Sequence, residues 1–153
     1  MHQGNAVLYP APMDRVDRVD SIRTLLDAPS PAVLTLYRPD GTALVSPVWF
    51  RVNGDAFEVV IAAGDGKLTY LSRDPRCVLL VFETIPPFRG VEVRAEAALS
   101  ADGVNEARLS IASRYLGAER GRRFAERRGD QGFVLRVPTE NARLWNLRAI
   151  LPP

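Results

Sequence analysis

Ile61–Pro75 has the sequence Ile-Ala-Ala-Gly-Asp-Gly-Lys-Leu-Thr-Tyr-Leu-Ser-Arg-Asp-Pro, and the fold is organised around it. The apolar, β-rich run Ala56–Ala62 that leads into it predicts a strand. Gly64 and Gly66 can adopt backbone angles that other residues avoid, so they predict a tight turn. A short helix is expected to begin at Lys67 and to end before the final proline, because the residue before proline is biased away from helical angles.

The start of this short helix is a candidate anion-binding site. The first turn of a helix has free N–H groups and a partial positive charge. Lys67 is the only lysine in the chain, and it adds a full positive charge at that point. The alternative is a structural role, in which the turn caps the helix and Lys67 is an ordinary surface residue. From these residues alone, both interpretations stay open.

Composition limits the chemistry of the protein. A chain of 153 residues is expected to form one domain with a core of its own, and a net charge of +2 is too small to require nucleic acid. The single cysteine, Cys77, excludes an internal disulfide and a cysteine zinc site. The single histidine, His2, stands at the N-terminus, which argues against a histidine-based catalytic triad or metal site.

The ends of the chain and its hydropathy predict the location of the protein. No apolar run approaches membrane-spanning length, and the first residues lack the basic segment and apolar core of a signal peptide. We therefore expect a cytoplasmic protein without membrane contact. Residues 1–12 hold two prolines and no periodicity, so they predict a flexible N-terminal arm, and residues 13–153 are expected to form a single domain.

Periodicity and turn signals predict an α+β fold. Apolar residues recur at helical spacing in Met13–Asp27, Val104–Leu116 and Glu119–Arg128. Asp40-Gly41 and Asn53-Gly54 separate runs of β-branched residues and predict hairpins. Six strands with hairpin links indicate an antiparallel barrel with flanking helices. The predicted strands are Ala32–Tyr37, Thr42–Val52, Ala56–Ala62, Arg76–Glu83, Arg89–Leu99 and Phe133–Leu147.

Three segments, in this order and spacing, carry a resemblance to a known family. They are Asp40–Phe50 (Asp-Gly-Thr-Ala-Leu-Val-Ser-Pro-Val-Trp-Phe), Gly66–Val81 with its Lys-x-x-x-Leu-x-x-Asp-Pro-Arg element, and the late strand Arg143-Leu144-Trp145. Over about Asp20 to Leu147, the chain resembles the split-barrel family of pyridoxamine 5′-phosphate oxidase-like proteins. The resemblance implies a six-stranded antiparallel split β-barrel with flanking helices that binds FMN or the deazaflavin coenzyme F420.

The same resemblance implies a homodimer with the cofactor at its interface. The cofactor ring would pack on the strand that carries Ser46–Trp49, and its phosphate would meet the turn Gly64–Lys67, where the anion site is expected. Asp65 departs from the basic or hydroxyl residue of the family, and an acid beside a phosphate is unfavourable. The implied cofactor-binding residues are Ser46, Pro47, Val48, Trp49, Ala62, Ala63, Gly66, Lys67 and Trp145, and the implied substrate pocket includes Phe88 and Arg143.

The resemblance is closer to the F420-using branch than to the FMN-using oxidases, whose longer C-terminal Arg/His motif is absent here. The implied function is hydride transfer between F420 and an unsaturated small organic substrate. The cofactor supplies the chemistry, so no catalytic side chain is assigned. The alternatives are an FMN-dependent oxidoreductase, a non-catalytic flavin or deazaflavin binder, and a haem binder, for which the body of the chain has no histidine ligand.

Two further features bear on partners. The arginine-rich segment Arg114–Arg128 is either a solvated helix face or a surface for the oligoglutamate tail of F420. Nucleic acid is a third candidate, although the aromatic residues are not interleaved with the arginines as stacking would require. The open side of a small split barrel exposes apolar strand surface, which a second copy of the chain would cover.

Overall fold

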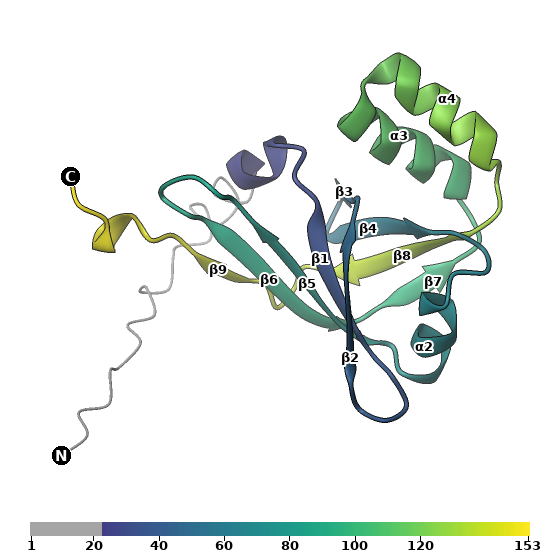
Figure 1. Cartoon of the computed structure of the whole chain (residues 1–153), viewed down its shortest axis with the longest axis horizontal. Helices are drawn as coiled ribbons and strands as arrows, with labels where there is room; N and C mark the ends of the chain where they lie inside the picture. Colours follow the sequence, from purple (N-terminus) through teal and green to yellow (C-terminus); the bar gives the residue numbers. More distant parts are fainter. Residues whose placement is uncertain (1–22) are drawn as a thin grey trace.

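The computed structural model describes residues 23–153, and two antiparallel sheets with a pair of helices to one side dominate it (Figure 1). The predicted arm at residues 1–12 and most of the predicted helix Met13–Asp27 lie outside the described residues. Residues 23–27 are helical, in agreement with the end of that predicted helix.

In residues 23–153, nine strands form two separate sheets. One sheet has five strands in the order β2-β1-β5-β6-β9, and the other has four in the order β3-β4-β8-β7. All of the pairings are antiparallel. The first sheet comprises β2 (Ala43–Val48), β1 (Ala32–Tyr37), β5 (Arg76–Phe82), β6 (Gly90–Glu96) and β9 (Arg143–Trp145). The second comprises β3 (Arg51–Asn53), β4 (Ala56–Ile61), β8 (Phe133–Pro138) and β7 (Ala98–Ser100).

The helices lie at the margins of the sheets. Helix α2 (Lys67–Arg73) follows β4, α3 (Val104–Leu116) and α4 (Ala118–Arg128) form an adjacent pair, and the 3₁₀ turn η1 (Arg148–Ile150) is near the C-terminus (Figure 1). Helix α3 packs on the four-stranded sheet, where Val104 and Ala107 lie against Val134 and Val60. This packing fixes the helical pair beside β4, and the candidate site is formed there.

The prediction of six strands is wrong, because three of the predicted strands are each divided into two. Thr42–Val52 becomes β2 and β3, Arg89–Leu99 becomes β6 and β7, and Phe133–Leu147 becomes β8 and β9. Each break moves the chain from one sheet to the other. The two sheets therefore do not close into one continuous barrel, which agrees with the split character that the resemblance implies.

The core lies between the sheets. Its largest fully buried side chains come from both sheets and from the corner between β2 and β3, where Phe50 is completely buried. Phe50 meets Phe57 of β4 edge to face, with ring centroids 5.6 Å apart. On the opposite face of the five-stranded sheet, Val33 is paired with Pro47 and Leu80, and Thr35 with Val45 and Val78. Val45 is 59% exposed, so this outer face carries apolar side chains that the chain covers only in part.

Candidate functional site

A cleft of about 360 Å³ lies where the helical pair α3–α4 approaches β4 and the corner between the sheets. Its volume is at the lower end of the range for small-molecule sites. Apolar side chains make most of its wall, and charged side chains come from the turn before α2 and from the two helices. The lining residues are Pro47, Val48, Trp49, Val59, Val60, Ile61, Ala62, Asp65, Lys67, Arg108, Ile111, Ala112, Phe124 and Arg128.

Trp49 is held rigidly in this wall by aromatic neighbours. Its ring stacks on Tyr115 of α3, with centroids 5.0 Å apart and planes 7° apart, and it meets Phe124 of α4 at 5.6 Å and 50°. The Tyr115 hydroxyl donates to the carbonyl of Ser30 at 3.0 Å and accepts from the N–H of Phe50 at 3.3 Å. Both bonds hold the Tyr115 hydroxyl in place, so Trp49 stacks on a ring whose position is fixed by the fold.

Lys67 and Asp65 form an ion pair at the start of α2. The Lys67 Nζ lies 3.2 Å from Asp65 Oδ2, and the Lys67 backbone N–H donates to Asp65 Oδ1 at 2.9 Å. The next N–H, that of Leu68, donates to the Asp65 carbonyl at 3.1 Å. The backbone N–H of Lys67, at the expected anion site, is therefore already bonded within the chain. This N–H is therefore not available to an anion, and the charged side chains of the cleft supply positive charge in its place.

Two arginines supply further positive charge. Arg108 is only 6% exposed, and its guanidinium donates to the carbonyls of Gly129 and Gln131, the latter at 2.6 Å. Burial, together with the nearby charge of Arg128, lowers the pKa of Arg108 from its ordinary value, and no described carboxylate forms an ion pair with it. The Arg128 guanidinium lies over the Phe124 ring, 5.2 Å from its centroid.

The charges of the cleft are therefore unequal. Among the lining residues that the structure describes, Lys67, Arg108 and Arg128 are cations and Asp65 is the only carboxylate. An apolar wall beside an excess of positive charge suits a flat organic ligand with an anionic group, because low-dielectric surroundings strengthen the attraction. None of the described residues that line the cleft is a serine, threonine, cysteine or histidine.

The sequence predicted only part of this set. Pro47, Val48, Trp49, Ala62 and Lys67 were all predicted and all line the cleft. The predicted residues Ser46, Ala63 and Gly66 stand next to lining residues in the chain without lining the cleft themselves. Ser46 is paired with Leu34 in the β1–β2 ladder.

Arg108 was missed, although the sequence contains a signal for it. It lies on the same helical face as Val104, Ala107 and Ile111, at the spacing of the buried side of α3. An arginine on a buried face needs polar partners or a ligand, because burying an unpaired charge is costly. That exception to the apolar pattern was visible in the sequence.

The remaining predicted residues lie away from the cleft of the same chain. Trp145 and Arg143 belong to β9, which is at the opposite edge of the five-stranded sheet from β2, and Phe88 is in the loop before β6. The Arg143 guanidinium lies over the Trp145 ring at 5.1 Å, and it also contacts Glu92 at 3.3 Å. One chain alone does not bring these three residues to the cleft.

The arginine-rich segment Arg114–Arg128 has no single role. Arg114 donates to the carbonyls of Leu26 and Ala28, so it anchors the chain before β1. On the exposed surface of α4, Arg122 pairs with Glu126 and Arg123 with Glu119. These arginines have structural or surface partners, whereas Arg128 lines the cleft.

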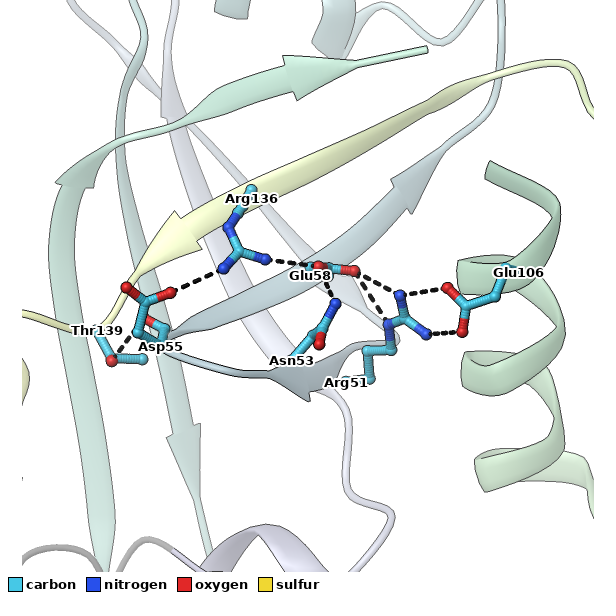
Figure 2. Close-up of polar contacts among 7 residues, drawn as sticks. All are labelled: Arg51, Asn53, Asp55, Glu58, Glu106, Arg136 and Thr139. Atoms are coloured by element: carbon cyan, nitrogen blue, oxygen red, sulfur yellow. Dashed lines mark hydrogen bonds and ion pairs between the residues drawn. The ribbon is translucent and has the colours of Figure 1, made fainter. Parts of the chain in front are cut away.

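A polar network outside the cleft attaches α3 to the four-stranded sheet (Figure 2). Glu58, which is 5% exposed, accepts hydrogen bonds from Arg51 at 2.8 Å, from Asn53 at 2.8 Å and from Arg136 at 2.7 Å. Arg51 also donates to Glu106 of α3 at 2.7 Å. Burial alone would raise the pKa of Glu58, but the hydrogen bonds and the two arginine charges lower it below its ordinary value.

Other kinds of site have no support in residues 23–153. No group of three or more His, Cys, Asp or Glu side chains there could hold a metal ion. Burial raises the pKa of the Cys77 thiol to about 11, so this thiol is protonated at neutral pH. None of the helices described is both long enough and apolar enough to cross a membrane.

Comparison with protein families decides the class of the protein. The family model for pyridoxamine 5'-phosphate oxidase matches residues 19–146, which is most of the chain. The chain belongs to this family. The family is one of flavin-binding oxidoreductases, so an apolar cleft with excess positive charge is in keeping with its members. A search of curated proteins gives no match.

Solved structures with the same fold have different roles. A conserved hypothetical protein from Mycobacterium tuberculosis has a TM-score of 0.75 and 21% identity, over 93% of this chain and 91% of that chain. An F420 reductase has a TM-score of 0.62 and 23% identity, with coverage of 79% and 94%. A haem storage protein from Vibrio cholerae has a TM-score of 0.63 and 13% identity, with coverage of 82% and 92%. At these identities, the comparisons show a shared fold alone.

Proposed function

We propose that this protein is an F420-dependent oxidoreductase that transfers a hydride between the deazaflavin and an unsaturated small organic substrate. The observation that carries the proposal is the cleft, which Trp49, stacked on Tyr115, lines together with Lys67, Arg108 and Arg128. The family supplies the class of chemistry, and the cleft supplies an apolar surface for a ring and cations for a phosphate. The proposal includes a cytoplasmic location.

The residues of the chain then act by binding and positioning. Pro47, Val48 and Trp49 would support the ring, and Lys67 with the two arginines would hold the phosphate. Ala62, Ala63 and Gly66 have small or absent side chains, which would let the backbone approach the ligand closely. When bound, F420 supplies the hydride, and the protein contributes orientation and exclusion of water.

The proposal includes a homodimer whose two chains build each cleft together. The outer face of the five-stranded sheet is apolar and partly exposed, so a second copy would bury it. Trp145, Phe88 and Arg143 lie at the edge of that sheet remote from β2. They would therefore reach only the cleft of the partner chain, across this interface. This agrees with the expected position of the cofactor between the two subunits.

Three other functions remain alternatives to this proposal. An FMN-dependent oxidoreductase or a non-catalytic flavin binder would use the same cleft, and turnover rather than structure separates an enzyme from a carrier. Haem binding is the least supported alternative, because residues 3–153 contain no histidine to serve as an axial ligand.

The test is a fluorescence titration of the purified protein with F420 and, separately, with FMN. Lys67→Gln should weaken F420 binding by about tenfold, because it removes one charge from the cleft. Arg38→Gln is the matched control, since it removes one charge from a side chain that bonds within its own hairpin outside the cleft and should leave binding unchanged. Oxidation of reduced F420 by a panel of conjugated substrates then tests turnover. Absence of saturable binding of either cofactor would overturn the proposal.

A further inference from the structure

Asp65 places a negative charge where a ligand phosphate is expected. Its carboxylate lies 3.2 Å from the Lys67 Nζ, and it is the only carboxylate among the described residues that line the cleft. The side chains of Asp65 and Lys67 are 33% and 19% exposed, so both are partly withdrawn from solvent. A charge in this position acts on any anion that approaches Lys67.

The local fold does not require that charge. The backbone N–H of Lys67 needs an acceptor two residues before it, and the side-chain oxygen of asparagine would serve equally well. The chain repeats the arrangement at the other end of α2, where the N–H of Arg76 donates to Asp74 Oδ1 at 3.1 Å and the Arg76 side chain pairs with Asp74 at 2.7 Å. That second pair is not part of the cleft lining.

The effect of the Asp65 charge depends on the charge of the ligand. A phosphomonoester such as that of FMN carries about −1.5 to −2 at neutral pH, because its second pKa is about 6. The phosphodiester of F420 has only one ionisable oxygen and carries a single negative charge. Coulombic repulsion is proportional to the ligand charge, so Asp65 disfavours the monoester about twice as strongly, in free energy, as the diester.

We propose that Asp65 is a specificity-determining residue that shifts the selectivity of the cleft toward a singly charged phosphodiester and away from a doubly charged phosphomonoester. The inference rests on the proposed function, because it assumes that the ligand phosphate lies near Lys67. Asp65 neutralises part of the Lys67 charge, and it removes about twice as much of the attraction for a doubly charged ligand as for a singly charged one. The residue thereby shifts the relative affinity of the cleft toward F420 and away from FMN.

The test compares ligands that share one ring and differ in charge. Riboflavin is neutral, the cyclic riboflavin phosphodiester carries one negative charge, and FMN carries about two. Asp65→Asn should strengthen binding of the cyclic diester and of F420 by a similar factor, about threefold to tenfold. It should strengthen FMN binding by roughly the square of that factor and leave riboflavin binding unchanged. Asp65→Ser also keeps an acceptor oxygen, and it should give the same ranking of the changes in affinity among these ligands.

Asp74→Asn is the matched control, because it removes the same charge from the same kind of turn outside the cleft. It should change none of these affinities. A uniform effect of Asp65→Asn on all ligands, or no effect, would overturn the inference while wild-type binding of F420 still supported the proposed function. Failure of the wild type to bind F420, FMN or the cyclic diester would overturn both.

Discussion

Trp49 and Tyr115 stack with their ring planes 7° apart and their centroids 5.0 Å apart, and this contact joins the corner between the sheets to helix α3. Tyr115 also bonds to Ser30 and Phe50, which belong to the segments on either side of β1 and β2. One side chain therefore ties the helical pair to the sheet and orients the aromatic wall of the cleft. The cleft depends on this junction.

Substitutions at Tyr115 should separate its two contributions. Tyr115→Phe removes the hydroxyl bonds and should lower the free energy of unfolding by about 1 kcal/mol. Tyr115→Leu also removes the stacked ring and should cost about 1 kcal/mol more, with weaker F420 binding, because Trp49 is then free to reorient. Urea denaturation measures the free energy of unfolding, and fluorescence titration measures the F420 affinity. Tyr37→Phe is the control, since no described residue hydrogen-bonds to its hydroxyl. A similar loss of stability in Tyr37→Phe would contradict the role given to the hydrogen bonds of Tyr115.

Glu58 should couple stability to pH. Its pKa is lowered in the folded state, so the stabilisation is complete above the ordinary carboxyl pKa of 4.5 and is lost as pH falls through the folded value. Glu58→Gln should cost about 2 kcal/mol near neutral pH, because it weakens charged hydrogen bonds from the half-buried Arg51 and from Arg136, although Arg51 keeps Glu106 as a second partner. That difference from wild type should stay constant down to about pH 5 and shrink below it.

Denaturation curves for wild type and Glu58→Gln across this pH range provide the measurement. Glu119→Gln is the control, because Glu119 forms an exposed pair with Arg123 on one helix and should cost less than about 0.5 kcal/mol. A difference between wild type and Glu58→Gln that grew on acidification would contradict the assigned direction of the Glu58 pKa.

Local patterns in the sequence predicted most single elements and failed at the corners. Strand β1 and helix α3 have the predicted bounds, because apolar periodicity and turn residues mark both of their ends. Trp49 and Phe50 stand between β2 and β3, where apolar residues continue across the corner without a turn signal. A change of sheet depends on packing between segments that are distant in sequence, and Phe50 is fully buried at this corner for that reason.

The candidate site was predictable to a similar extent. Lys67 follows both from the helix-start pattern and from the family resemblance, and the Pro47–Trp49 segment follows from the resemblance alone; the structure places both in the lining of the cleft. The ion pair between Lys67 and Asp65 was not predicted, since the distance between the two side chains depends on the geometry of the turn and not on their separation in the sequence. Arg108 comes to the cleft only because α3 packs on β4, and that contact is a property of the folded chain.

The proposed dimer can be tested on the outer face of the five-stranded sheet. Val45 is 59% exposed there, and Val45→Glu should place a charge in the interface and convert a dimer to a monomer in light scattering. Val52 is a comparably exposed valine, at 43%, on β3 of the other sheet, so Val52→Glu should leave the dimer intact. A wild-type monomer at micromolar concentration, or equal effects of the two variants, would count against this interface.

Gly90 should be intolerant of any side chain because Trp145 lies directly over it. A Cβ at Gly90 would be 1.9 Å from Cζ2 of Trp145, so the indole or strand β9 would have to move. Gly90→Ala should cost about 1–3 kcal/mol of stability. The cost should largely vanish when Trp145→Ala is also present, because the clash is then removed, and a double-mutant cycle measures that coupling.

Gly66→Ala is the matched control, since nothing lies within 4 Å of its Cβ position and its φ of −58° suits alanine. It should change stability by less than about 1 kcal/mol. If Trp145 completes the cleft of the second chain, Gly90→Ala should also weaken F420 binding, although it leaves Lys67 and Trp49 untouched. Gly90→Ala could instead lose stability as expected and keep its F420 affinity. That result would mean that Trp145 has only a structural role and that one chain forms the whole cleft.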